Sequence, residues 1–350
     1  MLVAVYGASG YQAKLVLAEL TRHGIAAVLV GRDIDRVRRA ASEVGLATSP
    51  QRVAAITDHA ALVAGFDGCD AVINCAGPFT DSGHAVVRAA INAGCHYVDT
   101  AGEQLYLKTI FDTFMDDAER SGVTVVPATN DGCLPGDLIA HLIAEQLSPI
   151  DEITVSHVIV GGGGPSRGSL RSALHTADIL ATGGLSYDAG EWHTGLPARH
   201  TAVLLPGASE PTPMAKLPLA EVITIPRHVS VGHVESLVEA SLSARLSTPI
   251  SPKIIETVPE GPTEQERRTQ RFTYVVDAAS ADGRTARGLL HGVDTYGTTA
   301  VIAVEAARRL VADGAKPGVL APAQAFDPRS FLDFLVPHGL QWSISTHDQT

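Results

Sequence analysis

The chain opens with the stretch that decides its fold, Leu2-Val3-Ala4-Val5-Tyr6-Gly7-Ala8-Ser9-Gly10-Tyr11-Gln12-Ala13. Five strand-forming residues run into a Gly-x-x-Gly-x-x-Ala turn, and a helical pattern follows. Gly7 allows a sharp turn, Gly10 has no Cβ to keep a pyrophosphate away, and Ala13 lets the helix pack close to the sheet. Free N–H groups and the dipole at the helix start favour an anion. The stretch predicts a dinucleotide-binding unit that contacts its cofactor through Gly7, Ala8, Ser9, Gly10, Tyr11 and Gln12.

The end of the expected second strand, residues 26–30, indicates which nucleotide is bound. A unit that prefers NAD usually has an acidic residue here to hold the ribose hydroxyls. This chain has Gly31-Arg32 instead. A guanidinium suits a 2′-phosphate, so Gly31 and Arg32 predict NADP. The alternative is a solvated arginine in a charged loop.

Strand and helix patterns alternate through the first 126 residues. Expected strands at 53–56, 71–75, 97–98 and 123–126 are separated by expected helices at 35–44, 58–64, 82–93 and 105–121. This rhythm is typical of a doubly wound parallel sheet, whose ligands bind beyond the carboxyl ends of the strands. We therefore expect the cofactor to be lined by Asn74, Cys75, Ala76, Gly77, Pro78, Phe79 and Thr100. Asn74 has an alternative role, tying down the turn with side-chain hydrogen bonds.

Composition limits the classes of function. A chain of 350 residues, 45% hydrophobic and 18% charged, suits a packed globule of two domains. A net charge of −12 argues against nucleic acid or anionic membrane as the main partner. With no apolar run of ~20 residues and no leader pattern, we expect no stable membrane insertion and a cytoplasmic protein. The cysteine and histidine spacings match no metal motif, so no metal is expected.

Four blocks carry a resemblance to a known family. They are Gly7-Ala8-Ser9-Gly10-Tyr11, Gly31-Arg32, Asn74-Cys75-Ala76-Gly77-Pro78-Phe79 and Tyr97-Val98-Asp99-Thr100-Ala101-Gly102-Glu103. In this order and spacing the chain resembles the saccharopine dehydrogenase-like oxidoreductases, including their trans-acting enoyl reductase branch. The resemblance implies an NADP-binding Rossmann domain, a mixed α+β second domain and hydride transfer. One departure is at Asn130–Asp137, where the family tends to have Gly-Phe-Asp-x-x-Pro-x-Asp, and it leaves the substrate class open.

We therefore expect an α/β protein with an N-terminal Rossmann domain at 1–132 and an α+β substrate and dimerisation domain at 133–294. Residues 271–279 and 285–293 form the clearest hairpin pattern. The resemblance implies that residues 295–350 pack back on the first domain. Residues 161–169 form a glycine-rich loop before an expected helix at 170–180. This loop is either a flexible lid or substrate-carboxylate site with Arg167 or Arg171, or a plain mobile loop.

The chemistry expected at the nicotinamide is reduction by hydride and protonation by a nearby acid. Asp99, Glu103 and Tyr97 lie near its expected position and are the candidate catalytic residues, each with a structural role as the alternative. No tyrosine is followed by lysine in a Tyr-x-x-x-Lys pair, which excludes the short-chain dehydrogenases. The sequence predicts an NADPH-dependent oxidoreductase, a homodimer, acting on a C=N (imine) or C=C (enoyl) bond of a small-molecule or acyl substrate. The alternative is a non-catalytic NADP-binding sensor or partner subunit.

Overall fold

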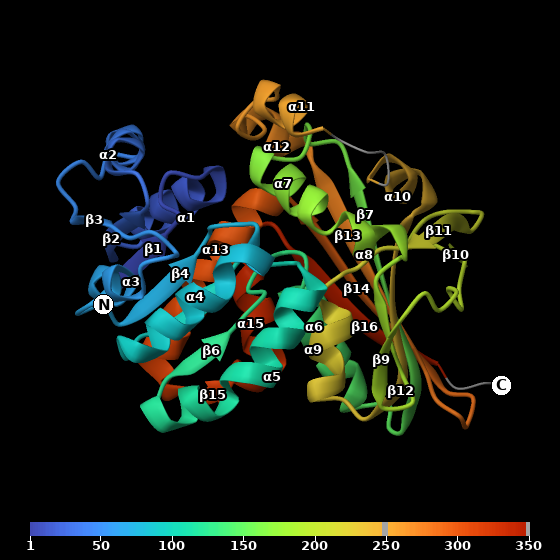
Figure 1. Cartoon of the computed structure of the whole chain (residues 1–350). Helices are drawn as coiled ribbons and strands as arrows, with labels where there is room; N and C mark the ends of the chain where they lie inside the picture. The colour runs from blue at the N-terminus through green and yellow to red at the C-terminus, as the bar shows by residue number, and fades with distance from the viewer. Residues whose placement is uncertain (247–250, 348–350) are drawn as a thin grey trace.

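A computed structural model describes residues 1–246 and 251–347 and shows two β-sheets with helices packed on and between them (Figure 1). The first sheet has seven strands, and each adjacent pair is parallel. Its strands, in spatial order, are β15 (Gly318–Val319), β6 (Thr124–Val126), β5 (His96–Asp99), β4 (Ala71–Asn74), β1 (Leu2–Tyr6), β2 (Ala26–Gly31) and β3 (Gln51–Val53). The expected doubly wound parallel sheet is confirmed.

The first sheet is buried because helices cover both of its faces. Val3, Ala4 and Val5 of the central strand β1 are fully buried, as a continuous apolar run requires in a parallel sheet. The connecting helices are α1 (Tyr11–Arg22), α2 (Ile34–Glu43), α3 (His59–Phe66), α4 (Phe79–Asn92) and α5 (Gln104–Ser121). Helices α3, α4 and α5 form one packed row, and α1 packs against α13 (Thr295–Arg309).

The second sheet is mixed and lies beside the first domain (Figure 1). Its main path is β10 (Ala202–Val203), β11 (Thr212–Lys216), β12 (Val231–Glu239), β7 (Ile150–Val160), β13 (Arg271–Ala279), β14 (Thr285–Val293) and β16 (Gln341–His347). The ribbon of β8 (Leu185–Asp188) and β9 (Glu191–Thr194) attaches to β12. Strands β7 and β12 are parallel, and the other neighbours are antiparallel.

Short helices surround this second sheet and join it to the first domain. They are α6 (Leu134–Ala144), α7 (Arg167–His175), α8 (Ala177–Ala181), α9 (Glu221–Thr224), α10 (Ala240–Leu246), α11 (Pro252–Thr257), α12 (Glu264–Thr269), α14 (Pro322–Ala325) and α15 (Pro328–Leu335). Helix α6 contacts β13 and β14 on one side and α14 and α15 on the other. The link after β6 is therefore a packed junction between the two sheets.

The C-terminal segment divides between the two sheets. Helix α13 packs on α1, β4 and β5, and β15 extends the first sheet beside β6. Strand β16 differs from the expected return to the first domain, because it pairs with β14 in the second sheet. Strand β16 thereby covers the edge of β14, which would otherwise present unpaired backbone N–H and C=O groups. Residues 348–350 of the segment lie outside the described residues.

Two local expectations also differ from the structure. The helix expected at 170–180 is divided at Thr176, which ends α7 and precedes α8. The third strand lies at Gln51–Val53, before the expected 53–56. The hairpin at 271–279 and 285–293 forms as β13 and β14. In the part of the chain that the structure describes, no helix is both long enough and apolar enough to span a bilayer.

Candidate functional site

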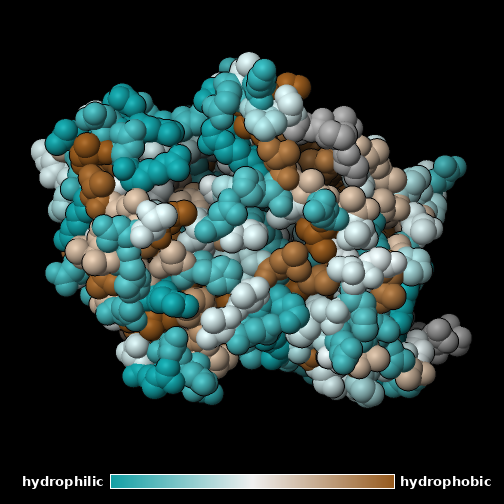
Figure 2. Space-filling model, in the orientation of Figure 1, coloured by the Kyte–Doolittle hydropathy of each residue, from teal (hydrophilic) through white to brown (hydrophobic). Residues whose placement is uncertain are grey.

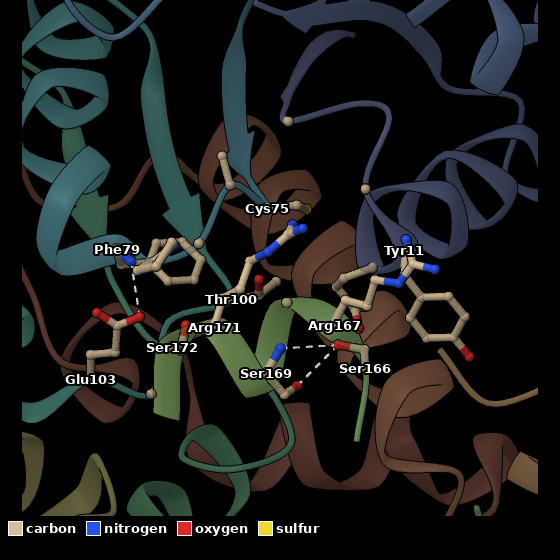
Figure 3. A pocket seen from close by; sticks show the side chains of 18 of the residues that line it. Tyr11, Cys75, Phe79, Thr100, Glu103, Ser166, Arg167, Ser169, Arg171 and Ser172 are labelled. Atoms are coloured by element: carbon tan, nitrogen blue, oxygen red, sulfur yellow. Dashed lines mark hydrogen bonds between the residues drawn. The ribbon is translucent and has the colours of Figure 1, made fainter. Parts of the chain in front are cut away.

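A cleft of about 1360 Å³ lies between the carboxyl edge of the first sheet and the second-domain helices α7 and α8. Its first wall comes from the turn after β1, the end of β2 and the loops after β4, β5 and β6. In the view of Figure 2, which has the orientation of Figure 1, apolar surface gathers in the middle of the molecule and mostly hydrophilic surface lies around it. Figure 3 shows residues from both walls, with Cys75 and Thr100 opposite Ser166–Ser172.

The turn after β1 has the geometry that a diphosphate requires. Gly7 has a φ of +77°, and a Cβ on it would lie 2.8 Å from the Cβ of Ala76, so only glycine fits. Gly10 is the N-cap of α1, and a Cβ there would meet one atom within 4 Å, the Gly7 carbonyl oxygen. No side chain caps this helix, so its first N–H groups are available to a ligand. These residues fit the pyrophosphate of a dinucleotide.

Three arginines line the cleft at the end of β2 and along α2. Arg32 follows β2, and Arg36 and Arg39 stand on the facing side of α2. None of the three forms an ion pair with a described residue. The nearby acid, Asp33, accepts hydrogen bonds from the N–H groups of Asp35 (3.0 Å) and Arg36 (3.1 Å) as the N-cap of α2. The Asp33 carboxylate is therefore engaged by the start of α2 and does not pair with the three arginines. Their positive charge fits a 2′-phosphate.

Asp99 and Tyr97 lie behind the cleft wall in a buried network. The Asp99 carboxylate accepts hydrogen bonds from the hydroxyls of Tyr97 (2.9 Å) and Tyr106 (2.6 Å) and from the N–H groups of Ala101 (3.1 Å) and Ala128 (2.8 Å). Burial raises the pKa of Asp99, although these hydrogen bonds oppose the shift. The network ties the loops after β5 and β6 together. It places neither Tyr97 nor Asp99 on the cleft surface.

Asn74 belongs to the same network. Its side-chain N–H donates to the Tyr97 hydroxyl (3.0 Å), and its Oδ1 accepts from the N–H of Ala76 (2.9 Å). The side chain is fully buried and holds the turn after β4, as its alternative role proposed. The Asn74 side chain therefore shapes the loop that faces the cofactor.

Glu103 does line the cleft, but its carboxylate is engaged. It accepts from the N–H groups of Phe79 (2.9 Å) and Thr80 (2.7 Å) and from the Thr80 hydroxyl (2.5 Å). Phe79 begins α4, so the Glu103 carboxylate accepts hydrogen bonds from the free N–H groups at the start of that helix (Figure 3). This arrangement holds the loop after β4 against the loop after β5.

Most of the predicted cofactor-binding residues line the cleft. They are Gly7, Ser9, Gly10, Tyr11, Gln12, Gly31, Arg32, Cys75, Ala76, Gly77, Pro78, Phe79 and Thr100. Ala8 and Asn74 are fully buried outside it. Burial raises the pKa of the Cys75 thiol, and the negative charge of Asp99 raises it further. Cys75 therefore stays protonated near neutral pH.

The sequence did not lead us to Asp131, a carboxyl that lines the cleft after β6. Thr299 of α13 donates its hydroxyl to Asp131 Oδ1 (2.8 Å) and accepts the Asp131 N–H (3.1 Å). Burial raises the pKa of Asp131 from 3.8 to about 7, with Thr299 opposing the shift. The position of Asp131 just after a strand of the parallel sheet was an available signal. Arg36 and Arg39 were also missed, although their i, i+3 spacing places both on one face of α2.

A neutral histidine forms part of the cleft floor. His157 of β7 is 6% exposed, stacks on Tyr274 at 4.0 Å between ring centroids and shares a 3.1 Å hydrogen bond between Nδ1 and the Tyr274 hydroxyl. Burial lowers the pKa of His157 to about 3. The ring is uncharged at physiological pH, so the cleft floor beside β7 carries no cation. Among the described residues, no group of three His, Cys, Asp or Glu side chains is arranged to hold a metal ion.

The second-domain wall is apolar in part and carries the serines of α7 besides. Its larger apolar members are Ile159, Ile179, Leu180, Leu217, Pro218, Leu219 and Leu246, each partly exposed. The two arginines of α7 are engaged at the rim. Arg171 pairs with Glu256 (2.6 Å), and Arg167 donates from Nε to the Val258 carbonyl (2.7 Å).

Comparison with known proteins agrees with this geometry. The model of the saccharopine dehydrogenase NADP-binding domain matches residues 3–126, which hold the turn, Arg32 and the loops after β4 and β5. Residues 3–126 are therefore similar to a saccharopine dehydrogenase NADP-binding domain. NADP is accordingly the cofactor, and the resemblance to the saccharopine dehydrogenase-like oxidoreductases is confirmed.

Relatives and one solved structure extend the comparison beyond the NADP-binding domain. A trans-acting enoyl reductase from Mycobacterium bovis is 29% identical over 140 residues, covering 39% of this chain and 34% of that protein. A saccharopine dehydrogenase-like oxidoreductase from Bos taurus is 26% identical over 152 residues, covering 39% and 35%. A lipid droplet localized protein from Caenorhabditis elegans is 27% identical over 196 residues, covering 53% and 46%. The matches therefore span less than half the length of each relative.

The L-Glu-forming saccharopine dehydrogenase of Saccharomyces cerevisiae has a TM-score of 0.64 to this chain. The superposition covers 99% of this chain and 100% of that one at 15% identity. At this level of identity the likeness shows a shared fold, including the second mixed sheet. The similarity to named oxidoreductases is therefore confined to the NADP-binding domain and the residues that follow it directly.

Proposed function

We propose that this protein is an NADPH-dependent reductase that delivers a hydride to a C=N or C=C bond. One observation carries the proposal: a single continuous cleft joins the NADP-binding turn and Arg32 to the apolar second-domain wall. Such a cleft has room for a dinucleotide and a second molecule beside its nicotinamide end. NADPH supplies the hydride when it is bound.

The chain's own residues would bind and orient the reactants. The N–H groups at the start of α1 hold the diphosphate, and Arg32, Arg36 and Arg39 hold the 2′-phosphate. The loops at 75–79 and 100–103, fixed by Asp99 and Glu103, border the nicotinamide end. Residues 217–220 and α8 cover the opposite side and exclude water from it.

Between the two candidate bonds, the wall favours an enoyl substrate. An imine formed from amino acids would carry carboxylates and would need free arginines around it. Arg171 is paired with Glu256, Arg167 donates from Nε to the Val258 carbonyl, and the arginine cluster at Arg32 is at the adenine-ribose end. The apolar residues Ile179, Leu180, Leu217 and Leu219 suit the hydrocarbon chain of an acyl group. The name of the M. bovis relative agrees with this choice.

Two measurements test the proposal. Isothermal titration with NADPH and with NADH should show binding, tighter for NADPH, and no binding of either contradicts it. NADPH oxidation, followed at 340 nm, should then respond to trans-2-octenoyl-CoA more than to an imine formed in place from glyoxylate and an amine. A faster rate with the imine would reverse the choice of bond.

A non-catalytic NADP sensor or partner subunit is the second candidate. The observation in its favour is that Tyr97, Asp99 and Glu103 are all engaged in structural hydrogen bonds. A sensor would bind NADPH and leave it unoxidised with every acyl and imine probe. A reductase oxidises it with at least one.

The proposal includes a cytoplasmic homodimer in which residues 133–294 supply the substrate wall and the dimer contact. Sedimentation of the full chain would give twice the monomer mass. The C. elegans relative is named for lipid droplets, so fractionation of cells expressing the protein should compare the cytosolic and lipid-droplet fractions. Recovery in the droplet fraction would contradict the cytoplasmic location.

A further inference from the structure

Asp131 stands where the chain leaves the first sheet, after β6 and before α6. It is partly exposed to the cleft, and Thr299 is the one described side chain that hydrogen-bonds its carboxyl group. Thr299 lies on α13, which packs on β4 and β5. A cleft group is thus held by the helix that returns from the far end of the chain.

The other acids that line the cleft are each committed to a partner. Glu43 and Glu260 pair with Lys14 (2.7 and 2.9 Å), Asp81 pairs with His175 (2.8 Å) and Glu256 pairs with Arg171 (2.6 Å). Glu103 accepts the N–H groups at the start of α4. Asp131 is therefore the described cleft carboxyl that neither a cation nor a helix start engages.

The surroundings of Asp131 favour its neutral form. Burial raises its pKa to about 7, and the charge of Asp294 adds to the shift. Asp294 is itself paired with Arg267 (2.6 Å) at the start of α13. The other titratable neighbours are Tyr274 of β13 and Glu221 of α9, whose own pKa values burial raises well above their ordinary ranges. Near pH 7 a useful fraction of Asp131 carries a proton, as a general acid must.

We propose that Asp131 is the proton donor of the reductase, with Thr299 as the residue that positions it. The inference rests on the proposed function. Reduction adds a hydride to the β-carbon of an α,β-unsaturated acyl group, and the C=C electron pair moves to the α-carbon as an enolate. The Asp131 O–H bond then breaks, its hydrogen forms the new C–H bond at the α-carbon, and the carboxylate regains a proton from solvent after the product has left.

The test compares Asp131→Asn, Thr299→Val and a surface control, Asp116→Asn on α5. Asparagine keeps the size and the acceptor for Thr299 but cannot give up a proton. We expect Asp131→Asn to oxidise NADPH with trans-2-octenoyl-CoA at least about 100-fold more slowly than the wild type, with the NADPH affinity unchanged. Asp116→Asn should match the wild type.

Thr299→Val separates a catalytic acid from a structural one. Thr299 stabilises the carboxylate, so its loss should move the alkaline limb of the pH–rate profile to higher pH. A profile that keeps its midpoint while the rate falls overturns the assignment, because a merely structural role predicts that result.

A readout independent of turnover distinguishes this inference from the proposed function. Carbon-13 NMR of Asp-labelled protein with NADP bound, with Asp131→Asn used for assignment, should show a carboxyl that titrates near pH 7. Titration near 3.8 overturns the role of Asp131 even if the protein is a reductase. Titration near 7 in a protein that never oxidises NADPH supports the environment of Asp131 and contradicts the proposed function.

Discussion

The hydroxyl of Tyr11, in the NADP-binding turn, donates a 2.5 Å hydrogen bond to the carbonyl of Pro262, 251 residues later in the chain. Two more contacts join the same segments. Lys14 of α1 pairs with Glu260 (2.9 Å), and Gly261 packs so closely on the Tyr11 ring that a Cβ would lie 2.6 Å from it. The link between α11 and α12 therefore lies against the turn and lines the cleft through Glu260.

The contact between Tyr11 and Pro262 predicts that the Tyr11→Phe variant releases NADPH faster than the wild type. The substitution removes the hydrogen bond to Pro262 and keeps the ring contact with Tyr296 (5.2 Å). One lost hydrogen bond should raise the dissociation rate constant about 2- to 10-fold, measured by stopped-flow displacement. Tyr187→Phe, in the second sheet, is the matched control. An unchanged rate in Tyr11→Phe would show that the link between α11 and α12 does not retain the cofactor.

Arg32→Ala should weaken NADPH binding and leave NADH binding unchanged. A guanidinium on a 2′-phosphate makes charge-assisted hydrogen bonds, and NADH lacks that group. We expect a loss of about 10- to 100-fold in NADPH affinity by titration calorimetry, less at high salt. Arg38→Ala is the control, because Arg38 pairs with Asp35 (3.5 Å) outside the cleft. Equal losses for both nucleotides would indicate a structural role for Arg32.

The first domain was predictable because its signals are local. The apolar run 2–6, the glycine turn and the alternation of strands and helices each depend on residues close in sequence. The second sheet was harder, since β12 pairs in parallel with β7 across about 70 residues of chain. Its strands β8 to β11 are short, and residues 183–261 show little periodicity.

The candidate site was predictable in outline but not in its chemistry. The position of Asp99 at a strand end placed it near the cofactor, but its four donors come from β5, α5 and the loops after β5 and β6. Those partners determine that it faces the interior. Asp131 was missed because the residue that holds it at the cleft is distant in the sequence. Thr299, which holds it at the cleft, is 168 residues away.

Asp99→Ala should destabilise the fold rather than slow a reaction step. The change leaves two tyrosine hydroxyls and two backbone N–H groups without their shared buried acceptor. Each unsatisfied buried donor costs about 1–3 kcal/mol, so the free energy of unfolding should fall by about 3 kcal/mol or more. Urea denaturation measures this, with Asp116→Ala at an exposed position of α5 as the control. Full stability with lost turnover would instead restore Asp99 as a catalytic candidate.

Asp131 also predicts how stability depends on pH. Its pKa is about 7 in the folded protein against 3.8 when unfolded, so between these values the folded state binds the extra proton. The free energy of unfolding must then fall as pH rises through this window. The destabilisation caused by ionising Asp131 reaches its full size above about pH 7. Asp131→Asn removes that dependence.

We therefore expect the difference in unfolding free energy, Asp131→Asn minus wild type, to grow from pH 4 to pH 7 and then level off. Urea denaturation at each pH provides the values. Asp116→Asn, an exposed carboxyl, should show no such growth. A difference that is flat with pH would mean that Asp131 is ionised in the folded protein, because an ordinary pKa gives folded and unfolded states the same proton count.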